Sequence, residues 1–201
     1  MTGIEPTLAG ALRWAAARGY EHFTQVRLER SLRRAAENGV SVQDLCRTEV
    51  RFAHFVRMVR ALEVCSNNEM ADYLVDLMVG GVESRFSDDS PDQFQLLMDC
   101  LGSLTRTEII VLAEMRKLRL FDDERSGEDE SKRNELELFG ENSLGFSRDY
   151  LASLLNRMAG SGLVTSPGAT YGGGYARNSN RLSPLARELF HYLDYSHRIT
   201  N

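Results

Sequence analysis

Arginine, asparagine and serine side chains recur in two groups in the last third of the chain. The eight residues are Arg148, Ser153, Asn156, Arg157, Arg177, Asn178, Asn180 and Arg181. Arginine donates paired hydrogen bonds to guanine or phosphate, while asparagine and serine hydrogen-bond to phosphates and base edges. These side-chain types therefore indicate contacts with nucleic acid, and an ordinary solvated surface is the alternative.

The first group needs a helix to present it. Ser147 is a suitable N-cap, and the apolar residues after it recur at i, i+3, i+4 and i+7: Leu151, Leu154, Leu155 and Met158. This spacing predicts a helix over 147–158 whose apolar stripe faces a core. The four polar residues of the first group then lie on the outward face, as in a helix that enters a major groove.

The second group falls on a predicted β-hairpin. The segment 163–182 has the pattern of two short strands around a glycine-rich tip at 171–181. Side chains on such a tip can reach a minor groove or the DNA backbone. The glycines at 172–174 lack the spacing of nucleotide-binding loops, so no phosphate cradle is expected. A hairpin tip without a binding role is the alternative.

Three runs resemble MarR-type winged helix-turn-helix domains. They are Leu104-Thr105-Arg106-Thr107-Glu108, residues 155–164 and residues 181–189, and the resemblance covers roughly residues 103–195. It implies a winged-helix domain that binds double-stranded DNA, with the 147–158 helix in a major groove and the hairpin on the adjacent backbone. The chain departs from the family in an acidic insert at 122–134, whose charge opposes the approach of phosphates.

The last predicted helix carries an apolar stripe beyond the hairpin. Its members are Leu185, Leu189, Tyr192 and Leu193. A single winged-helix domain has little core left to cover such a stripe, so either a second chain or the N-terminal helices must bury it. We expect a homodimer, because two copies would read a two-fold DNA site.

The first half of the chain is a series of predicted amphipathic helices. Start and stop signals place them at about 20–38, 41–62, 66–80 and 90–101, with another at 104–120 and a short one at 135–139 before Gly140. Residues 20–120 also resemble the Abi-alpha group linked to phage resistance, through the runs 68–78 and 101–108. That resemblance implies a protein-interaction module in phage–host conflict, which is the alternative to DNA binding.

Charge is unevenly distributed along the chain, whose net charge is −5. Residues 13–60 carry ten arginines against five acids, residues 63–138 eight basic against nineteen acidic residues, and residues 139–201 six arginines against four acids. An acidic middle between two basic ends argues against a protein that coats nucleic acid through its overall charge. Only a local patch is therefore expected to bind DNA.

The residue patterns indicate neither catalysis nor a cofactor. The four histidines include no pair at i, i+3 or i+4, and Cys46, Cys65 and Cys100 are widely spaced in apolar patterns. Neither a metal site nor a disulfide framework is therefore expected. The carboxylate runs fit a solvated surface. Because no apolar run could cross a bilayer and the first residues do not resemble a signal peptide, we expect a cytoplasmic, non-enzymatic protein without membrane contact.

These patterns predict a mainly α-helical fold in two domains. With 201 residues, 42% of them hydrophobic, the chain can bury an ordinary core. A helical domain is expected over residues 1–102. A winged helix-turn-helix domain with a small β-hairpin is expected over residues 103–201, with the acidic, mobile insert 122–134 inside it. The expected function is regulatory DNA binding, as in transcription regulation, without catalysis.

Overall fold

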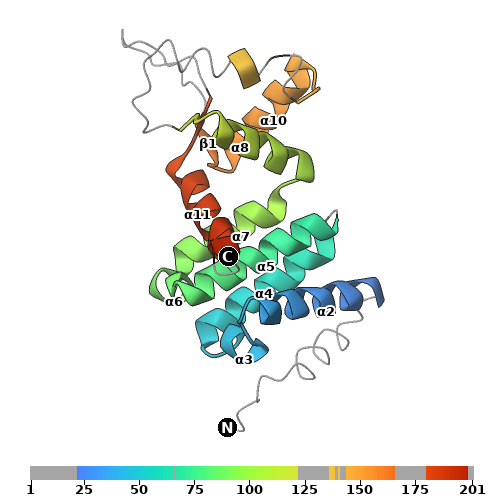
Figure 1. The fold of residues 1–201 in the computed structure, drawn as a ribbon, viewed down its shortest axis with the longest axis vertical. Helices are drawn as coiled ribbons and strands as arrows, with labels where there is room; N and C mark the ends of the chain where they lie inside the picture. The colour runs from blue at the N-terminus through green and yellow to red at the C-terminus, as the bar shows by residue number, and fades with distance from the viewer. Residues whose placement is uncertain are drawn as a thin grey trace. The chain divides into compact units, whose positions relative to one another are not determined.

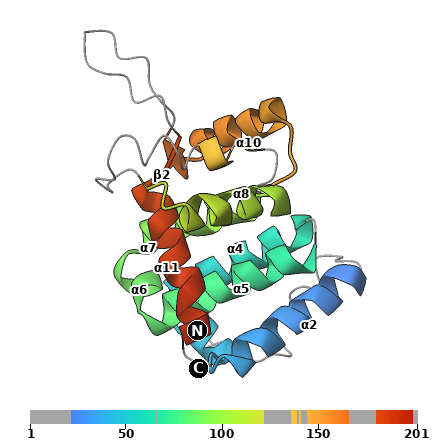
Figure 2. The same ribbon diagram turned by 45° about the horizontal axis from the view of Figure 1, so that its top comes forward.

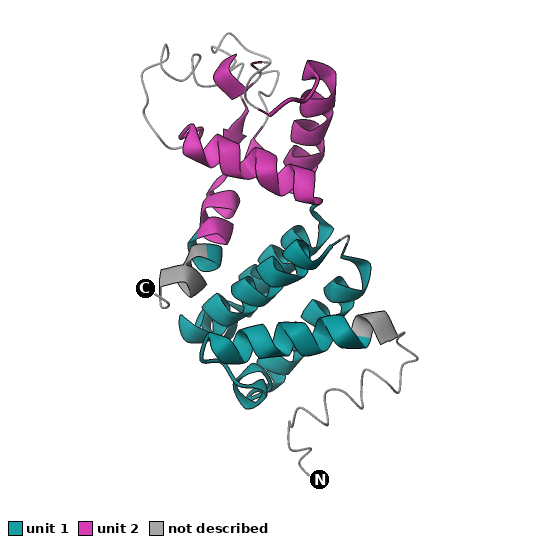
Figure 3. Cartoon of the chain, turned by 45° about the vertical axis from the view of Figure 1, so that its right-hand side comes forward, with its two compact units in different colours: residues 1–104, 191–201 teal, residues 105–190 magenta. Residues whose placement is uncertain are grey.

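The structure, a computed structural model of the chain, describes residues 22–65, 67–121, 136–138, 140, 144–165 and 180–198. Over these residues the fold is mainly helical with a small two-stranded sheet (Figure 1), which confirms the predicted class. The chain divides into two compact units (Figure 3): unit 1 is residues 1–104 with 191–201, and unit 2 is residues 105–190. The boundary after Leu104 is close to the predicted junction at 102–103, but the last residues belong to unit 1. The acidic insert lies outside the described residues.

Unit 1 is built around one buried helix. Its helices are α2 (His22–Glu37), α3 (Val42–Leu45), α4 (Glu49–Val64), α5 (Asn68–Glu83), α6 (Phe86–Asp89) and α7 (Pro91–Ser103). Every residue of α5 from Leu74 to Val82 is buried, and α2, α4, α6 and α7 all contact this helix (Figure 2). A helix that is buried around its whole circumference over more than two turns lies in a core, and α5 occupies that position.

The stretch 41–62, predicted as one helix, forms two. Ser41 makes a capping box with Asp44 ahead of α3, and Thr48 then accepts a hydrogen bond from the N–H of Arg51 and begins α4. The buried side of α4 runs from Arg51 through Phe55 to Leu62, and it leaves Phe52 47% exposed. The single-helix prediction was wrong because a four-residue helix is too short to show its own periodicity.

Two glycines of α5 allow close approach to its backbone. A Cβ atom on Gly81 would lie 2.2 Å from the ring of Phe94, and one on Gly80 would lie 2.5 Å from the carbonyl oxygen of Tyr192. Neither position has room for a side chain. Glycine is required at both because a Cβ atom would overlap a packed neighbour.

Tyr192 belongs to α11 (Pro184–Arg198), whose residues from 191 onwards are part of unit 1. Its ring stacks on that of Phe86, with centroids 4.4 Å apart. Leu189, earlier in the same helix, is buried in the chain as well. The C-terminal apolar stripe is thus covered at these positions without a second chain, so the stripe does not by itself require a dimer.

Arginines of α2 bind carboxylates of α5. Arg34 donates from Nε and Nη2 to the two carboxylate oxygens of Asp76 at 2.7 and 2.8 Å. One turn earlier, Arg30 pairs with Asp72 at 2.7 Å. Asp76 is buried, so its pair with Arg34 joins the two helices at the edge of the core. The arginine-rich start of the chain therefore serves the packing of unit 1.

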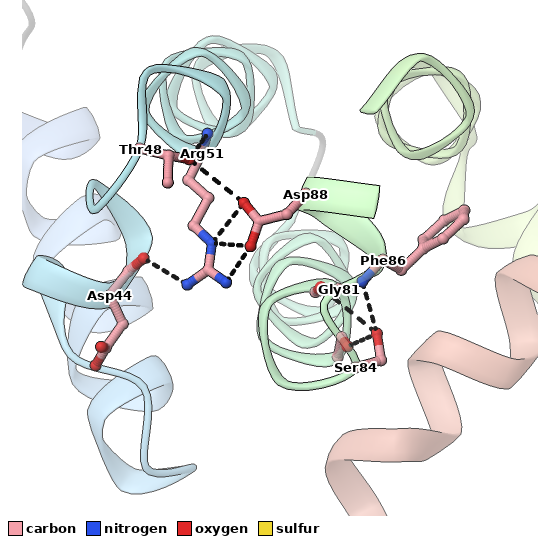
Figure 4. Close-up of polar contacts among 8 residues, drawn as sticks. Asp44, Thr48, Arg51, Gly81, Ser84, Phe86 and Asp88 are labelled. Carbon is pink, nitrogen blue, oxygen red and sulfur yellow. Dashed lines mark hydrogen bonds and ion pairs between the residues drawn. The ribbon is translucent and has the colours of Figure 1, made fainter. Parts of the chain in front are cut away.

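Two further arginines of unit 1 are buried and form hydrogen bonds within the fold. Arg27 donates to the carbonyl oxygens of Leu62 and Cys65 at 2.7 and 2.9 Å, and so caps the last turn of α4. Arg51 grips the carboxylate of Asp88, with Nε 2.9 Å from both oxygens, and also reaches the backbone of α3 (Figure 4). The hydrogen bonds from Arg51 hold the pKa of Asp88 below its ordinary value.

Unit 1 buries a histidine whose protonation opposes folding. His54 of α4 is almost fully buried, and its ring meets that of Phe94 edge-on with centroids 4.9 Å apart. Burial lowers the pKa of His54 below its ordinary value; Arg57 lowers it further, while Asp88 and Asp99 act in the opposite direction. The neutral ring is therefore the folded form.

Acidification below about pH 6.5, the usual pKa of histidine, is therefore expected to destabilise unit 1. Because the folded pKa is depressed, the contribution of His54 is complete above the unfolded pKa and is lost as the pH falls through the folded one. Urea midpoints measured between about pH 8 and 5 should fall less for His54→Gln than for the natural chain. The exposed His191→Gln is the control. Equal pH dependence in His54→Gln and the natural chain would contradict the assignment.

Unit 2 combines helices with the small sheet. Its elements are α8 (Arg106–Lys117), a helical turn at 136–138, α10 (Arg148–Gly160), β1 (Val164–Thr165), β2 (Arg181–Leu182) and the first half of α11. The strands are antiparallel, with Val164 opposite Leu182 and Thr165 opposite Arg181. Phe121, just after α8, adds a parallel bridge to Leu182. The sheet therefore ties the end of α8 to the segment after α10.

Helix α10 ends at the predicted turn. Gly162, at φ +79°, donates to the carbonyl of Ala159 at 3.0 Å, and Leu163 donates to that of Met158 at 3.1 Å. This pair of bonds is a Schellman motif, whose left-handed residue is usually glycine. The predicted order of helix, turn and strand over 147–164 is confirmed.

Candidate nucleic-acid interface

Helix α10 has one apolar and one polar face. Ser147 caps the helix, and its Oγ accepts a hydrogen bond from the N–H of Tyr150 at 3.3 Å. The four residues of the predicted apolar stripe are all buried: Leu151, Leu154, Leu155 and Met158. The stripe is confirmed, and it leaves the remaining face of α10 exposed.

The predicted site residues of α10 are all exposed: Arg148, Ser153, Asn156 and Arg157. The Ser153 hydroxyl donates to the carbonyl of Asp149 at 2.9 Å and keeps its acceptor lone pairs. The Arg148 guanidinium suits a phosphate or guanine, and the Asn156 amide can both donate and accept toward a base edge. Asp149, also exposed in the first turn, is the acidic exception.

The fourth residue on α10, Arg157, is bound to a carboxylate of α8. Its guanidinium donates from Nε and Nη2 to the two oxygens of Glu108. Glu108 is fully buried, and it also accepts from the N–H and the hydroxyl of Thr105, both at 2.8 Å, in the capping box of α8. The Arg157 side chain is 51% exposed. Arg157 thus links the two helices of unit 2 through a buried charge.

This ion pair was not visible in the sequence. The Thr105–Glu108 capping box is a local signal that the sequence contains, and it is present in the structure. The guanidinium that binds the Glu108 carboxylate, that of Arg157, lies 49 residues further along the chain. Only the packing of α10 against α8 brings the two together, so residue type and helical face alone assigned Arg157 to DNA contact.

The predicted hairpin residues are only partly described. Arg177 and Asn178 lie outside the described residues, and Asn180 is half-buried just before β2. Arg181, expected at the exposed tip, lies within β2 opposite Thr165 and is only 8% exposed. The prediction that Arg181 lies at the tip was wrong. Strand β2 already begins at Arg181, a residue that the glycine-rich composition had placed in the tip.

Two other cations of unit 2 contact aromatic rings of the same unit. The guanidinium carbon of Arg116 lies 4.9 Å from the ring centroid of Phe190, and that of Arg187 lies 4.5 Å from that of Phe121. Such cation–π contacts hold the charge against the surface of unit 2. The polar face of α10 is therefore distinguished by the gathering of its polar side chains on one helix, and not by the number of its charged groups.

An exposed tyrosine is the residue of this face that sequence reasoning missed. Tyr150 is 48% exposed, and its ring meets that of Phe146 edge-on with centroids 5.5 Å apart. It lies between Arg148 and Ser153 in the helix and off the apolar stripe. Helical spacing could have identified Tyr150 as exposed. The apolar stripe starts one residue later, at Leu151, and adjacent residues of a helix do not share a face.

The comparisons with known proteins identify no relative. No family model, curated protein or solved structure matches the chain. Over the part of the chain that the structure describes, no group of three or more His, Cys, Asp or Glu could hold a metal ion. None of the described helices is long and apolar enough to cross a membrane.

Proposed function

We propose that unit 2 binds double-stranded DNA in a regulatory, non-catalytic role through the exposed face of α10. The order of its elements supports this: α8, the turn at 136–138, α10 and two antiparallel strands follow one another as in a winged helix-turn-helix. The observation that carries the proposal is the set of exposed polar residues on α10 opposite its buried stripe. Arg148 and Asn156 are the residues assigned to DNA contact.

The roles of the two residues differ in kind. Arg148, in the first turn, suits a phosphate, which fixes the protein on the duplex, or a guanine edge. Asn156 lies two turns further along the same face and suits an adenine edge. Arg157 is assigned to holding Glu108, so its replacement is not a clean test of DNA contact.

Arg148→Ala is expected to weaken binding to a fluorescent random duplex and to lower the salt slope of log K by about 0.9, the share of one phosphate contact. Lys117→Ala, which removes the same charge from α8, is the matched control and should leave the slope unchanged. Fluorescence anisotropy over a salt series measures both. Equal losses in the two variants would assign binding to overall charge, and no binding of the natural chain at low salt would refute the proposal.

A protein-interaction role is the second candidate. The exposed apolar surface of unit 2 favours it, because Tyr150 and Ile110 are both substantially exposed. Aromatic side chains are enriched in the cores of protein interfaces. Tyr150→Ser separates the two candidates: it should leave DNA affinity almost unchanged if Arg148 and Asn156 make the contacts.

A further inference from the structure

A groove on unit 1 has an apolar floor and a basic rim. It lies between α4 and α7, has a volume of about 420 Å³, and is lined by Arg57, Arg60, Ala61, Val64, Met98, Asp99, Gly102 and Ser103. Gly102 lets α7 approach α4 closely here, since an added Cβ atom would lie 3.2 Å from the Cβ of Ala61. Val64 on its edge is 75% exposed, an unusual position for a large apolar side chain.

The charge of the rim is poorly neutralised. Arg57 approaches Asp99 at 3.7 Å, but both side chains are about half-exposed, and such a pair contributes little. Arg60 is exposed and makes no ion pair with any residue that the structure describes. The groove therefore suits an apolar side chain accompanied by a carboxylate.

The chain itself carries such a segment in unit 2. The turn at 136–138 buries Leu138 in the core and leaves Leu136 69% exposed, with Glu137 exposed beside it. The N–H of Gly140 bonds to the carbonyl of Glu137 at 3.0 Å and closes the turn. Two leucines separated by one residue point to different sides of a single helical turn, so Leu136 cannot join the same core.

Leu136 is distinguished from the other exposed large apolar residues. In the described part of the chain these are Val26, Val50, Phe52, Val64, Leu96, Ile110, Leu136 and Tyr150. Leu136 alone among them has an acid on each side in the sequence, Glu135 and Glu137. An apolar side chain between two acids matches the apolar floor and the two arginines of the groove.

We propose that this groove receives Leu136 from a second copy of the chain, with Glu137 of that copy facing Arg57 and Arg60. In the proposed dimer each chain gives its turn to the groove of the other, so the two contacts are reciprocal and the assembly is closed. Each contact is small compared with a standard protein interface. The dimer is therefore held by two weak contacts and dissociates readily on dilution.

A charge exchange tests this contact in the full-length chain without DNA, by sedimentation equilibrium from low to high micromolar concentration. Arg60→Glu and Glu137→Arg are each expected to weaken dimerisation by about tenfold or more, and the chain that carries both changes should regain most of the lost association. Arg33→Glu, an exposed reversal on α2 away from the groove, is the matched control and should dimerise as the natural chain does.

Leu136→Ser provides an uncharged measurement, because it removes the apolar anchor from an exposed position where folding does not depend on it. It should weaken dimerisation at unchanged circular dichroism. A natural chain that stays monomeric at high concentration overturns the proposal. So does a double variant that associates no better than either single one. Neither result bears on the DNA affinity of α10, which is measured separately.

Discussion

Arg157→Ala is expected to destabilise unit 2 by about 2–3 kcal/mol, the range for hydrogen bonds to a charged group whose partner stays buried. The variant leaves the Glu108 carboxylate without its guanidinium, although the capping bonds from Thr105 remain. Hydrogen exchange of the α8 and α10 amides measures the loss in unit 2 directly. The neighbouring Asn156→Ala changes an exposed side chain and should alter exchange little.

A double-mutant cycle identifies the cause. Glu108→Gln removes the carboxylate charge but keeps a side chain, three residues after the Thr105 N-cap, that can still cap α8. In that background Arg157→Ala should cost much less than in the natural chain, since no buried charge remains to be paired. If the two losses simply add, the stability contributed by Arg157 arises from its packing rather than from Glu108.

Arg34→Met is expected to destabilise unit 1 by about 3–5 kcal/mol, the usual cost of removing one partner from a buried ion pair. The change takes two hydrogen bonds from the buried Asp76 in the centre of α5. Urea denaturation followed by circular dichroism measures the loss. Arg33→Met, at the exposed adjacent position, is the control and should change stability by about 0.5 kcal/mol or less.

The compensating change distinguishes charge from packing. Arg34→Met combined with Asp76→Leu replaces the pair with two apolar side chains and should recover much of the lost stability, because the desolvation of the carboxylate is also removed. A combined variant less stable than Arg34→Met alone would show that the geometry of the pair matters beyond its charge balance.

Local signals predicted most of the helical framework and the orientation of α10. The Ser147 cap, the stripe from Leu151 to Met158 and the glycine at 162 each act within one or two helical turns, and the sequence contains all of them. The capping box of Thr105 and Glu108 is a local signal of the same kind. Capping and periodicity depend on near neighbours, so they can be read without knowing the fold.

Long-range pairing could not be predicted. The partners Arg34 and Asp76 are 42 residues apart, and Arg157 and Glu108 are 49 apart. Helical spacing shows which face a charge occupies but not which helix will cover that face. For this reason Arg157 was assigned to DNA, although the structure binds it to Glu108. The α3–α4 break was missed for a local reason, because Thr48 interrupts the helix while the apolar spacing continues.

Helix α11 changes the order in which the chain can be completed during synthesis. Unit 2 is one uninterrupted stretch, so all its residues leave the ribosome before Tyr192 does. Unit 1 begins earlier but lacks the segment that packs against Gly80 until after residue 190. The domain translated first is thus the domain finished last, the reverse of the usual N-terminal-first order. Until then the backbone at Gly80 lacks the Tyr192 carbonyl that lies against it in the complete fold.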